Sequence, residues 1–276
     1  MNDTEFRREI INYIGASLDE FCEYKVGLLE MFRVFHAICR DNDFHYYYGF
    51  GSLLGIVRDD GMIPWDADID VLVPINRAEM LIRILKDNLP KDYYIVSNFL
   101  DPNYYLCETR ICRRGYNSDV FHIDIFYIIG APEDEKKRRK FDKKVKRYYY
   151  NRTIRYKQIE RGETSRDRLV YYAKKAIRFF MRLKPDFIFN RECDNLLFKY
   201  NYEKATYCIV WAVGGEIFPI SIFEPVKKYQ KDDFECLLPQ SPDAFLRIRY
   251  GEYWQYLPVQ DRFEEFYHSF KRFQSK

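Results

Sequence analysis

Three aspartates lie at alternate positions, Asp66, Asp68 and Asp70, a spacing that could place carboxylates together for metal binding. In a β-strand, residues two apart project from the same face, so Asp68 and Asp70 would point the same way. Two carboxylates held this close repel each other and raise each other's pKa unless a cation lies between them. A divalent cation that prefers oxygen ligands, Mg²⁺ or Mn²⁺, would resolve that conflict.

An Asp-x-Asp pair also occurs by chance at solvated strand edges and turns, where it binds nothing. The apolar neighbours of this pair favour a buried strand instead, where unpaired carboxylates are costly. These neighbours are Ile69, Val71, Leu72 and Val73. Asp66 shares the parity of the pair, but Pro64 and Trp65 place it at the mouth of the strand.

A glycine-rich junction, Gly49-Phe50-Gly51-Ser52, precedes the acids by a short helix and a turn. Glycine lets the backbone approach a ligand closely, and the free N–H groups at a helix start attract phosphate. Glycines at such junctions often serve the turn alone. The nearby acids favour a substrate-binding role for Gly51 and Ser52.

A further carboxylate, Asp124, lies inside the apolar run from Val120 to Ile129. A carboxylate in a buried strand needs a partner. Either an arginine (Arg110, Arg113 or Arg114) forms a structural ion pair with it, or Asp124 is a third metal ligand or a general base. His122 has the same parity as Asp124, so it is the histidine expected closest to the site.

The elements that must position these residues alternate between helices and strands. Helices are expected over 18–40, 52–58 and 77–89, and strands over 45–48, 68–73, 93–99, 105–112 and 120–129. After Pro132 the pattern becomes mainly helical, over 133–161, 166–183, 187–200 and 242–250, with a strand over 207–213. This order predicts an α+β fold with one mixed β-sheet and flanking helices. We expect a catalytic core over residues 1–132, and a basic helical region with a C-terminal part that completes the active-site cleft over 133–276.

The composition describes a globular protein. The 276 residues are 47% hydrophobic and 32% charged, which excludes the disordered class. The seven cysteines form no CxxC pair, which is typical of reduced thiols in a cytoplasmic protein. We expect no signal peptide and no membrane span, because no apolar run reaches about 18 residues.

The positive charge is concentrated in two segments, although the net charge is only +3. Residues 136–157 hold twelve basic residues and one acid, and residues 166–184 hold seven and one. An amphipathic basic helix can bind an anionic membrane or an anionic glycan, but its apolar stripe can equally pack on the catalytic domain. Peripheral membrane contact through 136–184 is therefore one of three alternatives. Nucleic-acid binding is not favoured, since no recognised motif accompanies the charge.

The segment around the acids resembles the LicD-family phosphotransferases, which include the fukutin-related proteins. The resemblance rests on Gly51-Ser-Leu-Leu-Gly55, Arg58, Gly61 and Ile63-Pro-Trp-Asp66-x-Asp68-x-Asp70, and extends through Phe218-Pro219 and Leu237-Leu238-Pro239 to Pro258. Ala67 stands where relatives often carry another residue, but position 67 points away from the face of Asp68 and Asp70.

This resemblance implies a nucleotidyltransferase-like mixed β-sheet core with a mainly helical C-terminal part. It implies that Asp68, Asp70 and Asp124 hold Mg²⁺ or Mn²⁺ and carry catalysis. It further implies that a phospho-alcohol, phosphocholine- or polyol-phosphate-like, moves from a CDP-linked donor to a cell-surface glycan acceptor with release of CMP. The acceptor could be lipid-linked, which would place the protein at the inner face of the membrane.

Substrate contacts are expected from Gly51, Ser52, Arg58 and Asp66. Arg58 could clamp phosphate through its planar donors or form a surface ion pair with Asp59 or Asp60. The same acids would also serve an enzyme that transfers the nucleotide itself. A non-catalytic anion- or membrane-binding module is the other alternative, although three acids would not help it bind anions.

Overall fold

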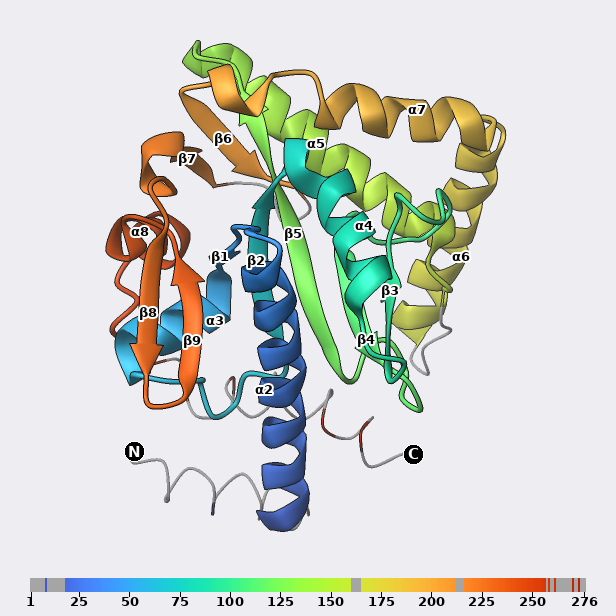
Figure 1. The fold of residues 1–276 in the computed structure, drawn as a ribbon. Coiled ribbons are helices and arrows are strands. Elements are labelled where there is room, and N and C mark those ends of the chain that lie inside the picture. The colour runs from blue at the N-terminus through green and yellow to red at the C-terminus, as the bar shows by residue number, and fades with distance from the viewer. Residues whose placement is uncertain are drawn as a thin grey trace.

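The computed structural model describes residues 8, 18–159, 165–211, 216–256, 258, 261, 270 and 273. The first half of the chain alternates helices with strands, as the sequence pattern predicts (Figure 1). Its elements are α2 (Leu18–Asp41), β1 (Tyr47–Tyr48), α3 (Phe50–Leu54), a π-helical turn (Gly55–Asp59), β2 (Ile69–Pro74), α4 (Ala78–Asn88), β3 (Tyr93–Val96), β4 (Thr109–Arg113) and β5 (His122–Ala131). The second half comprises α5 (Glu135–Tyr156), α6 (Ser165–Arg182), α7 (Asp186–Leu197), β6 (Tyr207–Val210), β7 (Ile217–Pro219), β8 (Lys227–Lys231), β9 (Phe234–Leu238) and α8 (Pro242–Tyr250).

A seven-stranded mixed sheet forms the centre of the molecule. Its main path runs β1-β2-β5-β4-β3, and β6 pairs with the C-terminal part of β5 and is followed by β7. Strands β2 and β5 are parallel, whereas the other neighbouring strands pair antiparallel. All ten residues of β5 are buried, because β2 covers one edge and β4 and β6 share the other. The predicted α+β fold with one mixed sheet is confirmed.

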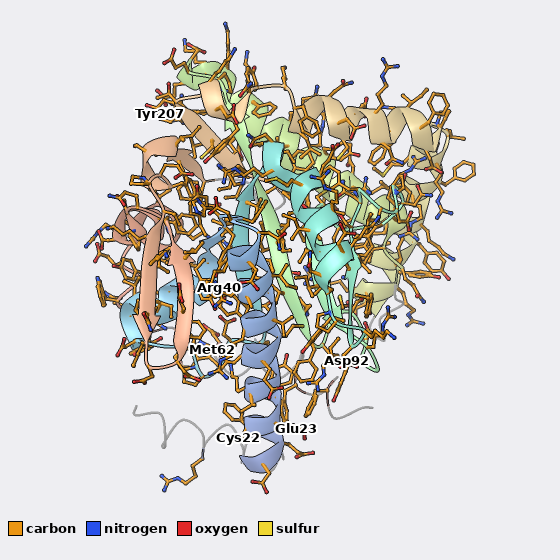
Figure 2. All side chains as sticks on the ribbon, in the orientation of Figure 1. Cys22, Glu23, Arg40, Met62, Asp92 and Tyr207 are labelled. Carbon is orange, nitrogen blue, oxygen red and sulfur yellow. The ribbon has the colours of Figure 1, made fainter. Side chains whose placement is uncertain are left out.

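Helices cover both faces of this sheet. In Figure 1, α2 and α4 lie in front of the sheet and α5 crosses behind it. The upper part of helix α2 lies in front of the sheet and its lower part extends below the strands, with Cys22 and Glu23 near the lower end and Arg40 near the upper end (Figure 2). One side of α2 is buried and mainly apolar, including Leu28, Phe32 and Phe35. Burial of about 25 cal/mol per Å² of such surface holds the helix on the strands.

The region after residue 132 is not purely helical. Helices α5, α6 and α7 come first, but β6 and β7 then join the central sheet and β8 pairs with β9 as a separate hairpin. The division at residue 132 therefore remains a prediction, and the sheet itself crosses it. Among the described residues, no helix combines the length and apolar character needed to cross a bilayer.

The short helix before the acids begins earlier than expected. It starts at Phe50 rather than Ser52, and from Gly55 it widens into the π-helical turn. A side chain at Gly55 would place its Cβ 2.4 Å from the carbonyl oxygen of Gly61. Glycine is thus required where this turn closes on the loop that leads to β2.

Candidate active site

The register of the sheet places the predicted acids in one row. Asp70 and Asp124 are direct partners across the parallel pair β2–β5, and Arg110 is the partner of Asp124 across β4–β5. Paired residues on neighbouring strands project to the same face. The three side chains therefore line one face of the sheet, and Asp68 lies just before β2 with the same parity as Asp70.

The alternation expected from the sequence is present. Asp66, Asp68 and Asp70 are half-buried, while Ala67 between them is buried. Position 67 thus points away from the acids, and its departure from the family pattern leaves their face unchanged.

Asp124 has the arginine partner that the sequence left as one alternative. Arg110 donates from Nε to Oδ1 of Asp124 at 2.6 Å and from Nη2 to Oδ2 at 3.1 Å, and it also contacts Asp119 at 2.5 Å. The side chains of Arg110 and Asp124 are 12% and 6% exposed. This buried two-pronged ion pair fixes the Asp124 carboxylate beside the other acids.

His122 belongs to the same cluster. Its Nε2 lies 3.5 Å from Oδ2 of Asp68 and 3.7 Å from Oδ2 of Asp124. One ligand atom from each of these three residues lies within 4.8 Å of the others, a spacing that could hold a metal ion. Sequence reasoning singled out His122 from its parity alone, but did not predict that it, rather than Asp70, would form the closest group with Asp68 and Asp124.

The acids perturb one another electrostatically. Burial, followed by the charges of Asp68, Asp66 and Asp124, raises the pKa of Asp70 well above its usual value. Burial also acts to raise the pKa of Asp68, but the hydrogen bond and charge of His122 outweigh it, so the pKa of Asp68 is lowered. The raised pKa of Asp70 thus reflects its burial beside three other carboxylates.

The donor set fits a divalent metal. Carboxylate oxygens suit Mg²⁺ and Mn²⁺, and the imidazole of His122 is a ligand more typical of transition metals. The raised pKa of Asp70 marks a place where an added cation would stabilise the ionised acids. The metal roles of Asp68, Asp70 and Asp124 remain predictions.

The Gly-Ser junction positions the acids directly. Ser52 is 5% exposed, and its Oγ accepts a hydrogen bond from the backbone N–H of Asp70 at 2.9 Å. A Cβ at Gly51 would lie 2.7 Å from Oδ2 of Asp66, so the absence of a side chain there allows this carboxylate to approach. Contact of Gly51 and Ser52 with phosphate remains a prediction, while their contacts with Asp66 and Asp70 are present in the structure.

Helix α2 holds the loop that carries the acids. The hydroxyl of Tyr24 is 2.6 Å from the carbonyl oxygen of Ala67 and 2.9 Å from that of Val120, so one buried group links the loops before β2 and β5. Lys25 donates to the carbonyl oxygens of Ile63 and Asp66. These long-range contacts join segments that no local pattern in the sequence connects.

A cavity of about 450 Å³ opens beside Asp66 and Gly51. Its walls carry four aromatic side chains and two carboxylates: Trp65, Tyr250, Tyr253, Tyr256, Asp66 and Glu252. The three tyrosines come from the C-terminal part of the chain. Burial raises the pKa of Tyr250, and the charges of Asp70 and Asp66 raise it further. The wall of the cavity at Tyr250 therefore lies within the electrostatic reach of the acid cluster.

Arg58 forms the ion pair with Asp59 that the sequence left open, but the pair is buried rather than on the surface. The two side chains are 6% and 12% exposed, and their closest atoms are 2.8 Å apart. The guanidinium of Arg58 also stacks on Tyr256, 4.3 Å from the ring centroid, and lies 5.8 Å from that of Trp65. Asp60 instead pairs with Lys231. A phosphate-binding role of Arg58 remains a prediction.

Comparison with known proteins places the acids inside a recognised domain. Residues 43–160 match the family model described as LicD/FKTN/FKRP, nucleotidyltransferase domain. Over 123 residues the chain is 28% identical to the lipopolysaccharide cholinephosphotransferase LicD of Haemophilus influenzae. That alignment covers 41% of this chain and 46% of the relative, so the two proteins are matched over about half of the relative's length.

Proposed function

Because residues 43–160 form a domain of the LicD family, we propose that this protein is a phosphotransferase with its active site at Asp68, Asp70 and Asp124. The proposed reaction moves a phospho-alcohol from a CDP-linked donor to a hydroxyl of a cell-surface glycan and releases CMP. The observation that carries the proposal is the row of acids on one sheet face, with Asp70 and Asp124 in direct register.

The acids would hold Mg²⁺ or Mn²⁺. A bound divalent ion would neutralise charge on the donor's pyrophosphate during transfer. Arg110 fixes the Asp124 carboxylate, and Ser52 fixes the backbone at Asp70, so both acids are oriented before substrate binds. Asp124 would also accept the proton of the acceptor hydroxyl.

The cavity beside Asp66 would receive the alcohol of the donor. Aromatic faces bind quaternary ammonium groups, and the carboxylates of Asp66 and Glu252 would add attraction for a cation such as choline. Arg58 already covers the face of Tyr256, so a trimethylammonium group would share these rings with it or displace it. A polyol would instead use the carboxylates and tyrosine hydroxyls as hydrogen-bond partners.

The direct test is CMP release from purified protein incubated with CDP-choline or CDP-ribitol and Mg²⁺ or Mn²⁺. We expect one of these donors to be hydrolysed slowly even without acceptor, and we expect EDTA to abolish the release until either metal is restored. Zinc should not be required. The Asp70→Asn variant is the matched control, because it keeps the size of the side chain and removes its charge.

The main alternative is transfer of the nucleotide itself to a sugar or small molecule, which the description of the matched domain favours. Pyrophosphate release from a nucleoside triphosphate, with no CMP release from any CDP-alcohol, would support that alternative and contradict the phosphotransferase proposal. Full activity in chelator would remove the metal from either reaction.

A further inference from the structure

The apolar side of helix α6 faces away from the rest of the protein. With about 100° of rotation per residue, Leu169, Ala173, Ile177 and Phe180 fall on one half of the helix. In a helix that packs on a protein core, this half would face inward. Here Leu169 is 72% exposed, Phe180 is 68% exposed and Ile177 is 44% exposed. The packing of this stripe on the catalytic domain, which the sequence left as one alternative, is contradicted by these exposures.

The opposite half of α6 faces the protein, and it does so through polar contacts. Arg178 donates to the backbone carbonyl oxygens of Ile154 and Lys157 at the end of α5. Arg155 of α5 in turn donates to the carbonyl oxygen of Met181. Tyr171, Arg178 and Met181 are the half-buried side chains of α6. The helix is thus anchored by arginine–carbonyl hydrogen bonds that leave its apolar half directed outward.

The apolar surface continues from α6 into the start of α7. The side chains involved are all at least 40% exposed: Leu169, Val170, Tyr172, Ile177, Phe179, Phe180, Leu183, Phe187 and Ile188. We call this set the α6–α7 apolar surface. Figure 1 shows α6 along the right side of the molecule and α7 along its upper edge, and the two helices meet at the upper right corner. Large exposed apolar surfaces on a folded protein mark interaction sites.

Cations flank this surface on both sides. On the helical wheel, Arg168, Lys175 and Arg182 border one edge, Lys174 borders the other and Arg166 lies within the apolar half; all five are exposed. The single acid of α6, Asp167, falls on the protein-facing half of the wheel. This arrangement complements a surface that is apolar inside and anionic at its boundary. Face-to-face contact of α6 with α6 of a second copy would bring these cations together, which does not favour a dimer through this helix.

We propose that the α6–α7 apolar surface inserts into the interfacial layer of an anionic lipid bilayer, with the flanking cations on the lipid headgroups. Helices of this kind lie in the membrane plane with the apolar face about 5–10 Å deep. The structure favours this partner over a protein because the surface combines exposed aromatic and aliphatic side chains with a border that is basic along α6. The proposal does not depend on the chemistry at Asp68, Asp70 and Asp124.

The test is co-sedimentation of the full chain with vesicles of phosphatidylcholine alone or mixed with phosphatidylglycerol, at low and high salt. We expect binding to the anionic vesicles that weakens at high salt. Leu169→Ser/Phe180→Ser should reduce that binding at least tenfold without lowering the melting temperature, because both side chains are exposed. Lys174→Gln/Lys175→Gln should weaken it about 25-fold at low salt, from a contribution of about fivefold per cation.

The matched control is Val26→Ser/Ile248→Ser, which removes two apolar side chains that are exposed elsewhere, 51% and 41% respectively. This variant should bind vesicles as the wild type does. The proposal is overturned if the wild type fails to sediment with anionic vesicles at low salt, or if Leu169→Ser/Phe180→Ser binds them unchanged. A dimer that forms through this surface, seen as self-association lost in Leu169→Ser/Phe180→Ser without vesicle binding, would also overturn it.

Discussion

Replacing Arg110 by glutamine should separate the structural role of the acid cluster from its metal role. Arg110 is the cation that contacts Asp124 with two hydrogen bonds and Asp119 with one. Removing one partner of a buried ion pair costs about 3–5 kcal/mol, because the remaining charge is left without compensation. The exposures of 12% for Arg110 and 6% for Asp124 leave little solvent to reduce that cost.

The expected loss of stability is large enough to measure as a change in melting temperature. For a domain of this size, each kcal/mol corresponds to about 2–4 °C, so Arg110→Gln should melt roughly 6–20 °C below the wild type in EDTA. If the acids bind Mg²⁺ or Mn²⁺, the ion replaces the missing positive charge. Metal at one hundred times its Kd would then return about 2.7 kcal/mol of stability.

The assay is thermal unfolding followed by circular dichroism, with and without metal. Arg114→Gln is the control, since Arg114 is exposed and donates only to the carbonyl oxygen of Lys91 among the contacts described. It should shift the melting temperature little in either condition. Equal melting of the two variants in EDTA would refute the ion-pair reasoning. A failure of Mg²⁺ and Mn²⁺ to raise the melting temperature of either the wild type or Arg110→Gln would refute the metal site.

Three further predictions concern the acid cluster and the residues that surround or support it. Asp68→Asn, Asp70→Asn and Asp124→Asn should each lower turnover about 100-fold or more while circular dichroism stays unchanged, and near-normal turnover of Asp124→Asn would exclude it as a third ligand. Burial and the charge of Asp124 raise the pKa of Glu108 from 4.5 to about 7. Between these two pH values the folded state keeps a proton that the unfolded state releases. The stability of the wild type should therefore fall as the pH rises from 4.5 to about 7. Glu108→Gln should remove that dependence. In urea unfolding, the free energy of unfolding of this variant relative to that of the wild type should be about 3 kcal/mol higher at pH 8 than at pH 4. Parallel pH curves for the two proteins would contradict this. Tyr24→Phe should lower the free energy of unfolding in urea by about 1–2 kcal/mol and slow CMP release, because the carbonyl oxygens of Ala67 and Val120 lose their buried donor. An unchanged unfolding midpoint would argue against that link.

Several features of the fold and the site follow from local pattern. The alternation of Asp66, Asp68 and Asp70 with apolar residues predicted a strand with its acids on one face, and the structure has that face. The apolar run around Asp124 predicted a buried strand, and β5 is buried along its whole length. Helix positions were also predictable, within a few residues at each end. Periodicity carries this information because it reflects which side of one element meets the core.

Long-range pairing lies outside such patterns. The family resemblance implied that Asp68, Asp70 and Asp124 share one site. No local pattern predicted that β2 and β5 are parallel, that Asp70 is the direct partner of Asp124, or which arginine meets Asp124. The sequence predicted that the C-terminal part completes the cleft, but not which side chains line it, because the tyrosines of the cavity are separated from Trp65 by almost two hundred residues. Register and strand order depend on how all elements pack together, and a one-residue slip would reverse every side chain.

Helix α6 illustrates most clearly the difference between what local sequence predicts and what tertiary packing decides. The sequence determined that Ser165–Arg182 forms an amphipathic basic helix, since the spacing of its apolar and basic residues is local information. It did not determine which half would meet the protein. The tertiary structure decided that point through Arg178 and Arg155, whose hydrogen bonds to backbone carbonyl oxygens hold the polar half inward. The spacing of apolar residues gives the direction of the apolar face relative to the helix axis, and only the packed neighbours fix that direction relative to the molecule.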